Sequence, residues 1–142
     1  GDVEAMNIYM NDVALKTFSS FDTGKHMSEK KAPENFFHGF VLGLMVDQTE
    51  HYIINSNRES GYGRYDIMLE PVDKNNAEYP AIIIEFKVIN KHKEDSLEET
   101  VQAALKQIEE KKYDIELIKR GVKKENIRHY GFAFRGREVL IG

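Results

Sequence analysis

The sequence predicts an α/β fold with a central mixed β-sheet flanked by helices. Two helical patterns come first, three strand patterns follow, and a long helical pattern separates these from two final strand patterns. The segment 81–89, Ala-Ile-Ile-Ile-Glu-Phe-Lys-Val-Ile, is apolar on both faces, as expected for a central strand covered on both sides. A strand pair followed by a helical crossover into another strand implies a sheet of mixed direction.

Two helices are predicted before the sheet. Residues 3–18 place Met6 and Met10 on one helical face, which we expect to pack on the core. After a polar loop, Pro33 suits the first turn of a second helix over about 33–47, whose broad apolar surface predicts burial.

The strands and the last helix follow from alternation, capping and turn residues. Ser96-Leu97-Glu98-Glu99 is a capping box that opens a long helix, which we expect to break near Tyr113 and to stop at Gly121. The turn-rich segment 56–61 is predicted to be a hairpin loop. The predicted strands are 51–55, 63–70, 81–89, 128–134 and 138–141.

Length and composition suit one soluble domain. The chain has 142 residues, within the roughly 100 to 200 typical of a single core, and 41% of them are hydrophobic. It has no cysteine, which excludes disulfides and thiolate metal sites and favours a reducing, cytoplasmic setting. No apolar run approaches the roughly 20 residues that cross a bilayer, so we expect no membrane association.

Charge is distributed unevenly along the chain. Residues 1–102 contain 10 Lys and Arg against 18 Asp and Glu, whereas residues 103–142 contain 10 against 6. A phosphate-binding surface would therefore lie mainly on the C-terminal part, with carboxylates upstream to hold cations. Lysines such as Lys106 and Lys119 are also typical of a solvated helix face, and charge alone favours that interpretation.

The central strand contains two charged residues that need an explanation. An ion buried without a partner costs several kcal/mol, yet Glu85 and Lys87 lie inside this strand. They are two positions apart and therefore project from one face at a separation of roughly 7 Å, while Phe86 points the other way. Asp66 alternates with Tyr65 and Ile67 on the preceding strand, so we expect it to reach the same face as Glu85.

Two carboxylates and a lysine have a specific chemical use. Carboxylate oxygens bind a hard divalent cation such as Mg²⁺, and a neighbouring lysine orients water or stabilises negative charge that develops at phosphorus. Composition and spacing alone fit a buried Asp-Lys-Glu ion network without a catalytic role equally well.

The wider sequence resembles the PD-(D/E)XK nuclease superfamily. Asp66 is followed after eighteen residues by Glu85-Phe86-Lys87 and then by a long helix. The resemblance extends to further stretches: Phe37–Leu44, Ser56–Gly61, Gly63–Ile67, Ala104–Ile108, Lys112-Tyr113 and Tyr130–Phe134. These look like the nuclease-type domain found C-terminal to an AAA-ATPase-like domain in bacterial proteins. Tyr65 stands where the superfamily name has proline.

The resemblance implies a restriction-endonuclease-like three-layer core of αβββαβ order and a role for each matching residue. Asp66, Glu85 and the Phe86 backbone carbonyl would hold Mg²⁺ or Mn²⁺, and Lys87 would be the catalytic lysine. Glu34 would support the metal or a water, and Gln107 would lie near the reaction centre. Arg58, Arg64, Lys111 and Tyr113 would contact the substrate.

Three supporting residues have ordinary alternatives. Glu34 lies in a first helical turn, where the helix dipole favours an acid anyway. His38 lies one turn after Glu34 and can join it, but a lone histidine on an apolar helix face is more often a hydrogen-bonded core residue. Gln107 leans inward beside Ala104, where it serves the site or caps a backbone group.

The leading hypothesis is a metal-dependent nuclease that hydrolyses nucleic-acid phosphodiesters, with DNA as the expected substrate. The alternative is a non-catalytic module that keeps the nuclease fold and binds or regulates within an AAA-ATPase-like protein. The resemblance divides the chain into an N-terminal helix and loop (1–32) and a nuclease-like domain (33–142), and implies an N-terminal AAA-ATPase-like partner domain in the same chain. The sequence leaves the choice between a monomer and a homodimer open.

Overall fold

Five strands form one mixed sheet in a computed structural model that describes residues 3–18, 38–39, 41–43, 49–56, 59–61, 63–136 and 138–142. The strands are β1 (Tyr52–Ser56), β4 (Ile67–Pro71), β5 (Ala81–Val88), β6 (Ile127–Arg135) and β7 (Glu138–Ile141). They lie in the order β1-β4-β5-β6-β7, with β5 and β6 parallel and every other pair antiparallel. The expected mixed sheet with β5 at its centre is confirmed.

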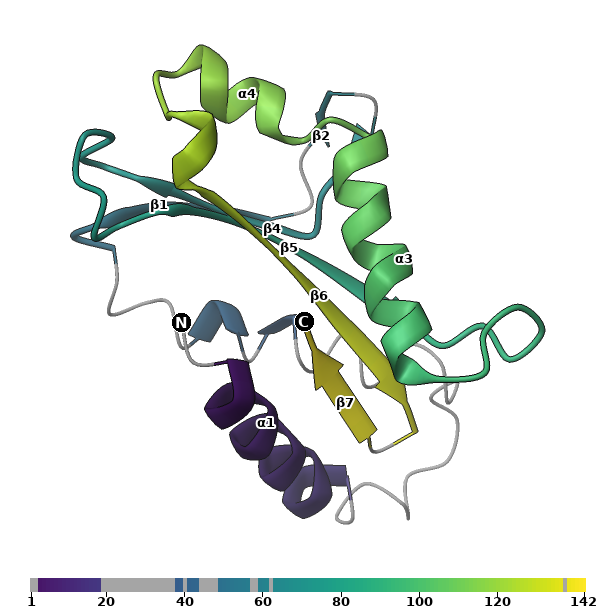
Figure 1. Ribbon diagram of the computed structural model, residues 1–142. Coiled ribbons are helices and arrows are strands. Elements are labelled where there is room, and N and C mark those ends of the chain that lie inside the picture. The colour runs from purple at the N-terminus through teal and green to yellow at the C-terminus, as the bar shows by residue number, and fades with distance from the viewer. Residues whose placement is uncertain are drawn as a thin grey trace.

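Helices lie on both sides of this sheet. The crossover from β5 to β6 contains α3 (Leu97–Glu110), α4 (Asp114–Lys119) and a short 3₁₀ helix, η2 (Lys124–Asn126). In Figure 1, α3 and α4 lie on one side of the sheet and α1 (Val3–Phe18) lies on the other, beside β7. Residues 38–39 and 41–43 are helical, and Val41 shares an apolar cluster with Met10 of α1. The arrangement has three layers, as expected for a restriction-endonuclease-like core.

Side chains of the central strands alternate between two apolar layers. Ile84 and Phe86 pack with Met10 on the α1 side, whereas Ile83 packs with Ile108 and Leu117 on the side of α3 and α4. All of these residues are buried. The strand β5 is therefore apolar on both faces, as expected. Glu85 and Lys87 are its two charged residues.

The helix α3 begins as its sequence predicts and lies directly on β6. The Ser96 hydroxyl accepts a hydrogen bond from the Glu99 N–H at 3.4 Å. The Glu99 carboxylate accepts from the Asp95 N–H at 2.9 Å, one residue earlier than a capping box requires. A Cβ atom at Gly131 would lie 2.9 Å from the Val101 carbonyl oxygen, so glycine allows this close approach.

The predicted strand 63–70 is wrong, because it is two strands. A short hairpin of β2 (Glu59–Ser60) and β3 (Gly63–Arg64) forms a separate two-stranded sheet, and β4 begins only at Ile67. Tyr65 and Asp66 lie between the two sheets. The alternation is interrupted there, since Tyr65 and Met68 share one cluster although they are three residues apart. Because β2 and β3 pair only with each other, the chain turns after β3 before β4 pairs with β1 and β5.

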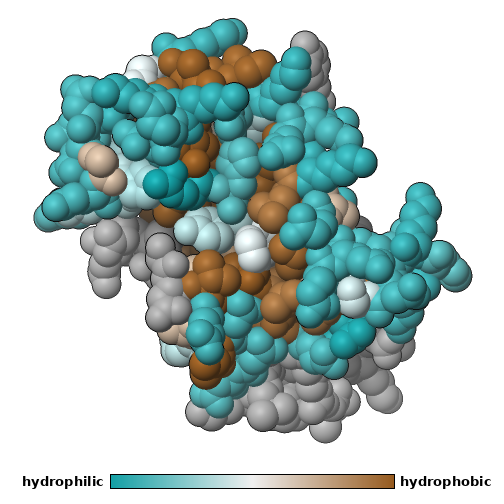
Figure 2. Space-filling view, in the orientation of Figure 1, coloured by the Kyte–Doolittle hydropathy of each residue, from teal (hydrophilic) through white to brown (hydrophobic). Residues whose placement is uncertain are grey.

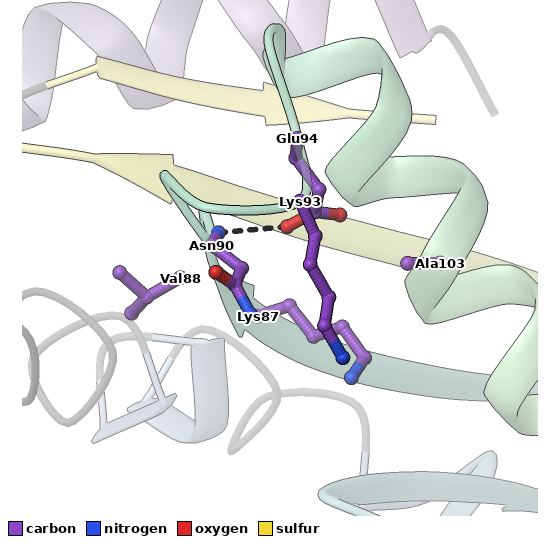
Figure 3. Close-up of a pocket in the computed structure, with 6 residues that line it drawn as sticks. All are labelled: Lys87, Val88, Asn90, Lys93, Glu94 and Ala103. Carbon is purple, nitrogen blue, oxygen red and sulfur yellow. Dashed lines mark hydrogen bonds between the residues drawn. The ribbon is translucent and has the colours of Figure 1, made fainter.

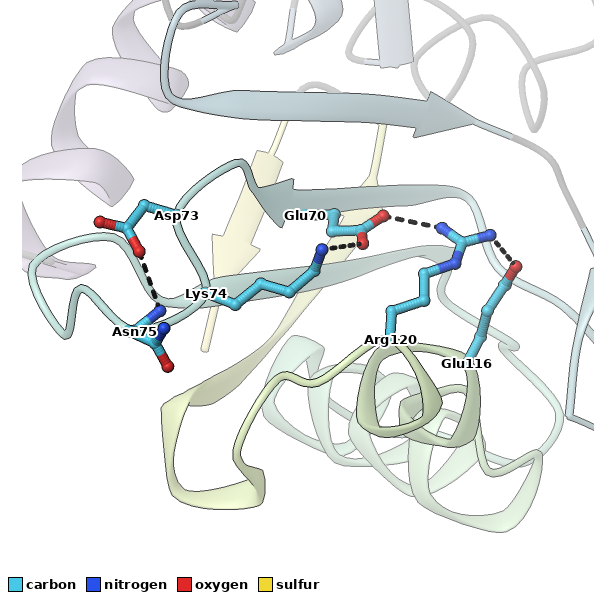
Figure 4. A network of polar contacts seen from close by, with 6 residues as sticks. All are labelled: Glu70, Asp73, Lys74, Asn75, Glu116 and Arg120. Carbon is cyan, nitrogen blue, oxygen red and sulfur yellow. Dashed lines mark hydrogen bonds and ion pairs between the residues drawn. The ribbon is translucent and has the colours of Figure 1, made fainter.

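The end of α4 is fixed by a glycine and by an ion-pair network (Figure 4). Gly121, at φ +99°, ends the helix as expected. Arg120 binds the buried Glu70 carboxylate of β4 at 2.7 Å and Glu116 at 2.5 Å, and Lys74 lies 3.6 Å from Glu70. Contact with Glu70 raises the pKa of the Arg120 guanidinium above its usual value. This network ties α4 to the sheet.

The face of the molecule seen in Figure 1 is mainly hydrophilic. Figure 2 shows hydrophilic side chains over most of this face, with hydrophobic residues visible at its upper end, over α4, and in a band through its centre. Lys106 on α3 is exposed and pairs with Glu110 one turn later. Among the described residues, no helix is long and apolar enough to cross a membrane.

The helix α1 is joined to the edge strand β7 by two asparagines one turn apart. Asn7 donates to the Ile141 carbonyl at 2.9 Å and accepts from the Ile141 N–H at 2.7 Å. Asn11 does the same at Val139, at 2.7 Å and 3.0 Å. Each side-chain amide thus takes the place of a backbone partner at the edge of the sheet, a position that proteins commonly protect from intermolecular pairing.

The hydrogen bonds of Asn7 and Asn11 to β7 predict that alanine at either position destabilises the protein. Alanine is the better helix former, so Asn7→Ala and Asn11→Ala would stabilise the protein if only propensity mattered. We expect each to lower the free energy of unfolding by about 1–3 kcal/mol, because backbone groups of β7 lose their partners. Urea unfolding measures the change. Ile8→Ala, at an exposed position of the same helix, is the control, and an equal effect there would contradict the pairing.

Candidate active site

Glu85 and Lys87 lie on the face of β5 that α3 covers. Phe86, between them, packs into the apolar cluster on the opposite side. The Glu85 side chain is almost completely buried, and Lys87 is partly exposed where the strand approaches its end. The alternation expected from the sequence therefore holds for these three residues.

Asp66 reaches the same place from the bend before β4. The register pairs Ile67 with Ile84, so residue 65 would face Phe86 if the ladder continued. The ladder ends before that point, and the Asp66 Oδ2 atom accepts the hydrogen bond from the Phe86 N–H at 2.7 Å. Asp66 was expected to reach this face as part of a strand. It does so from a bend, as a substitute for the missing backbone acceptor.

Burial and neighbouring groups act in opposite directions on Asp66. Burial raises the pKa of this carboxyl group because it disfavours the charged form. The Phe86 N–H, His38, a side-chain hydrogen bond with Glu85, and Lys87 act to lower the pKa. The Asp66 and Glu85 carboxyl groups therefore lie within hydrogen-bonding reach of each other and near the Lys87 ammonium. The two carboxylates and the lysine converge as expected.

Gln107 holds Glu85 from the facing helix. Its side-chain amide nitrogen donates to the Glu85 Oε1 atom at 2.6 Å and lies 3.4 Å from the Tyr113 hydroxyl. Of the two roles left open for Gln107, contact with the site is the one observed. Burial raises the pKa of the Tyr113 hydroxyl, and the carboxylates of Glu85 and Asp66 add to this shift, while the bond with Gln107 opposes it. Tyr113 therefore remains a neutral phenol at the rim of the acidic pair.

The hairpin that carries Asp66 is docked on the junction between α3 and α4. Gly61 has φ +58°, and a Cβ atom there would lie 2.2 Å from the Lys111 carbonyl oxygen. A Cβ atom at Gly63 would lie 3.1 Å from the Lys111 side chain and 3.3 Å from the Tyr113 hydroxyl. The Tyr65 ring meets the Tyr113 ring edge to face, with 6.0 Å between centroids. Glycine at both positions thus lets the hairpin approach the helix junction and fix Asp66.

His38 borders the site from the α1 side. The centroid of its ring lies 5.6 Å from that of the Phe86 ring, and its electrostatic effect lowers the pKa of Asp66. Its Nε2 atom is buried, and among the described residues it has no hydrogen-bond partner. The hydrogen bond expected of a core histidine is thus not found at this nitrogen. Sequence reasoning gave His38 a minor role, and the signal that pointed to it was its position one turn after Glu34.

A cavity opens beside Lys87 (Figure 3). It has a volume of about 470 Å³ and is lined by Lys87, Val88, Asn90, Lys93, Glu94 and Ala103. Lys93 and Asn90 belong to the loop after β5, and sequence reasoning did not single them out. The signal available was a basic stretch, Lys91-His92-Lys93, directly after the strand that carries Lys87.

The donor set around Asp66 and Glu85 fits a hard divalent cation. Neutral donors, the Phe86 N–H and the Gln107 amide, hold one oxygen of each carboxyl group. Carboxylate oxygens are the ligands that a hard cation prefers, and a cation bound between them would replace a proton that the two groups share. The N–H and C=O of one strand residue point to the same side, so the Phe86 carbonyl is directed toward the side of Asp66. Among the described residues, no group of three or more histidine or acidic side chains forms a metal-binding cluster.

The remaining expected residues are only partly accounted for. Glu34 and Arg58 lie outside the described residues, as does most of the predicted helix 33–47. Arg64 lies in β3, beside the bend that carries Asp66. Lys111 is exposed at the C-terminal cap of α3, next to the docked hairpin. The described part of the site thus unites Asp66, Glu85, Lys87, Gln107 and Tyr113.

The fold and the meeting of two acids and a lysine beside the central strand define a three-layer α/β domain with a charged site next to β5. A family model described as the PD-(D/E)XK nuclease superfamily matches residues 32–142. The chain therefore belongs to the PD-(D/E)XK nuclease superfamily. No curated protein matches the chain significantly.

The bond between Gln107 and Glu85 yields a stability prediction. Gln107→Leu removes the donor from a buried carboxylate, which we expect to lower the free energy of unfolding by about 1.5–3 kcal/mol. Gln102→Leu makes the same change at an exposed position of α3 and should alter it by less than about 0.5 kcal/mol. Urea unfolding of both variants measures the difference, and equal values would show that the observed bond does not stabilise the fold.

Proposed function

We propose that this domain is a divalent-metal-dependent nuclease that hydrolyses phosphodiester bonds of nucleic acid. Membership of the superfamily gives the reaction class. The observation that carries the proposal for this chain is the geometry of its charged groups. The Asp66 and Glu85 carboxyl groups meet beside Lys87, and a neutral donor holds one oxygen of each.

The assigned roles follow from those contacts. Asp66, Glu85 and the Phe86 carbonyl are the proposed holders of Mg²⁺ or Mn²⁺, with Glu34 as a further supporting acid. When bound, the cation would supply Lewis-acid stabilisation of charge on the phosphate oxygens and would lower the pKa of a bound water.

The protein groups prepare the site for hydrolysis. Gln107 fixes the rotamer of Glu85, and the Phe86 N–H fixes that of Asp66, so neither carboxylate has to reorganise during the reaction. The Lys87 ammonium is placed to stabilise negative charge that develops at phosphorus, as one phosphorus–oxygen ester bond is replaced by a bond to the oxygen of water. Gln107 and Tyr113, which is a neutral phenol, form the wall of the site on the α3 side.

The substrate and the domain context are further parts of the proposal. DNA is the proposed substrate, with Arg58, Arg64 and Lys111 as candidate phosphate contacts beside the docked hairpin. We propose residues 33–142 as the nuclease domain and residues 1–32 as an N-terminal extension that packs on it. The motif resemblance supports a full-length protein in which an AAA-ATPase-like domain precedes this one.

Cleavage assays test the proposed roles. Purified protein is incubated with Mg²⁺ or Mn²⁺ and labelled single-stranded or duplex DNA and RNA. We expect Asp66→Asn, Glu85→Gln and Lys87→Met each to reduce the cleavage rate by about 100-fold or more, a size typical of groups that act in the transition state. Glu98→Gln and Lys119→Gln, which change exposed charges on α3 and α4, should retain it. Variants of the three site residues that cleave as fast as the wild type would refute the assignment.

Metal binding is tested without reference to activity. A cation that binds only the folded state stabilises it by roughly 2.7 kcal/mol at 100 times its Kd, so the Tm of the wild type should rise with Mg²⁺ or Mn²⁺ concentration. Asp66→Asn and Glu85→Gln should abolish this rise, whereas Glu98→Gln should keep it. A wild-type Tm that does not respond to millimolar metal would favour the alternative, a non-catalytic module with the nuclease fold.

A further inference from the structure

The cavity beside Lys87 is lined by a second lysine, Lys93, which has no role in the proposed reaction. Lys93, in the loop between β5 and α3, lines the same cavity as Lys87. Figure 3 shows the two lysine side chains extending along the cavity, with their ammonium ends on the same side of it. Ala103 of α3 lines another part of the wall, and its small side chain leaves the space between helix and loop open.

The charges that line this cavity favour an anion. Lys87 and Lys93 are positive, Glu94 is negative, and the other lining residues are uncharged. The Glu94 Oε1 atom accepts a hydrogen bond from the Asn90 N–H at 2.7 Å. Among the described residues, neither lysine forms an ion pair. Two ammonium groups that share a cavity repel each other, and an anion between them would remove this cost.

The loop that carries Lys93 is held in place by its own hydrogen bonds. Besides the bond to the Glu94 carboxylate, Asn90 accepts from the Lys93 N–H at 3.0 Å and from the Glu94 N–H at 2.8 Å through its carbonyl. Its side-chain oxygen accepts from the His92 N–H at 3.1 Å. The backbone at Lys93 is therefore fixed next to the end of β5, and only the side chain has to be ordered when a ligand binds.

We propose that Lys93 and Lys87 together form a phosphate-binding subsite for the nucleic-acid backbone, next to the phosphate that is cleaved. The inference rests on the proposed nuclease function and adds a substrate-positioning residue to it. Lys87 faces both the acidic pair and the cavity, so a strand whose scissile phosphate lies at Asp66 and Glu85 would bring a neighbouring diester between the two lysines. Lys93 acts on substrate affinity and register, and Lys87 acts on the reacting phosphate as well.

Binding and turnover are measured separately. Fluorescence anisotropy gives the Kd for fluorescein-labelled single-stranded and duplex DNA without terminal phosphates, so every phosphate offered is an internal diester. The measurements are made in EDTA and in calcium over a series of salt concentrations, with the DNA checked by gel for cleavage. Lys93→Gln is compared with Lys91→Gln, which removes an exposed lysine of the same loop that does not line the cavity. Lys93→Arg tests for rescue by a charge-conserving change.

We expect Lys93→Gln to weaken binding by roughly 3- to 10-fold and to reduce the slope of log Kd against log salt by about 0.7 to 0.9, the value for one lost phosphate contact. Lys91→Gln should change neither, and Lys93→Arg should restore both. In cleavage assays with Mg²⁺ or Mn²⁺, Lys93→Gln should raise KM while kcat changes by less than about twofold, as expected for a positioning residue.

The possible failures are distinguishable. DNA binding that depends on Lys93 in a protein that cleaves no substrate would refute the nuclease proposal and support the subsite. Cleavage by the wild type with identical behaviour of Lys93→Gln and Lys91→Gln would overturn the subsite and leave the nuclease proposal intact. A wild-type protein that binds DNA in neither EDTA nor calcium would also overturn the subsite.

Discussion

The hydrogen bond from the Phe86 N–H to the Asp66 carboxylate is the constraint on which the site depends. Phe86 lies in the central strand, where a backbone donor without an acceptor would cost about 1–3 kcal/mol. The antiparallel ladder with β4 stops at Ile67 and Ile84, so an ordinary strand partner is not present beyond that point. A carboxylate takes its place, and the requirement for an acceptor therefore fixes an acid next to Glu85. The same interruption in β4 lets the hairpin turn away and dock on the α3–α4 junction.

Two buried glutamates on the same sheet differ in the kind of partner that the described contacts give them. Glu70, which is 2% exposed, is bound by Arg120 and faces Lys74, so cationic partners offset its charge. Glu85, which is 5% exposed, has an amide donor at its Oε1 atom and lies near a second carboxyl group. The two side chains are buried to a similar degree, so burial does not distinguish them. The guanidinium of Arg120 offsets the charge of Glu70, which argues for a structural role of that residue.

Sequence patterns predicted the parts of the site that depend on local periodicity. The placement of Glu85 and Lys87 on one face follows from strand alternation, which a central strand with two neighbours keeps strictly. The placement of Asp66 was expected from the same rule, but the rule does not apply there. The residue reaches the site because a hairpin of non-local origin docks on Gly61 and Gly63, and the pattern of apolar residues carries no record of where a strand ladder will stop. Strand alternation predicted the correct face for Asp66, although the residue reaches that face from a bend and not from a strand.

Contacts between elements that lie far apart in the chain were harder to predict from the sequence. The inward lean of Gln107 was readable from helical spacing, but its partner was not, since the register between α3 and β5 is set by tertiary packing such as that at Gly131. The pairing of Asn7 with Ile141 had no signal at all, because an asparagine on an amphipathic helix normally indicates a solvated position. Lys93 was hidden for a similar reason, as a lysine in a charged loop is usually a solvated residue.

Under the proposed function, the charge distribution on the α3 side of the sheet favours metal binding before substrate binding. Asp66 and Glu85 together repel a phosphate diester, while Lys87 lies between them and the cavity that Lys93 also lines. A nucleic-acid strand that arrives before a cation would be attracted on the lysine side and repelled at the point of reaction. Once the acidic pair carries a divalent ion, both parts of the site become favourable for neighbouring phosphates. Lys87 and Lys93 both belong to the acidic part of the chain, residues 1–102. The proposed subsite therefore lies outside the basic part, residues 103–142, where the charge distribution had predicted a phosphate-binding surface.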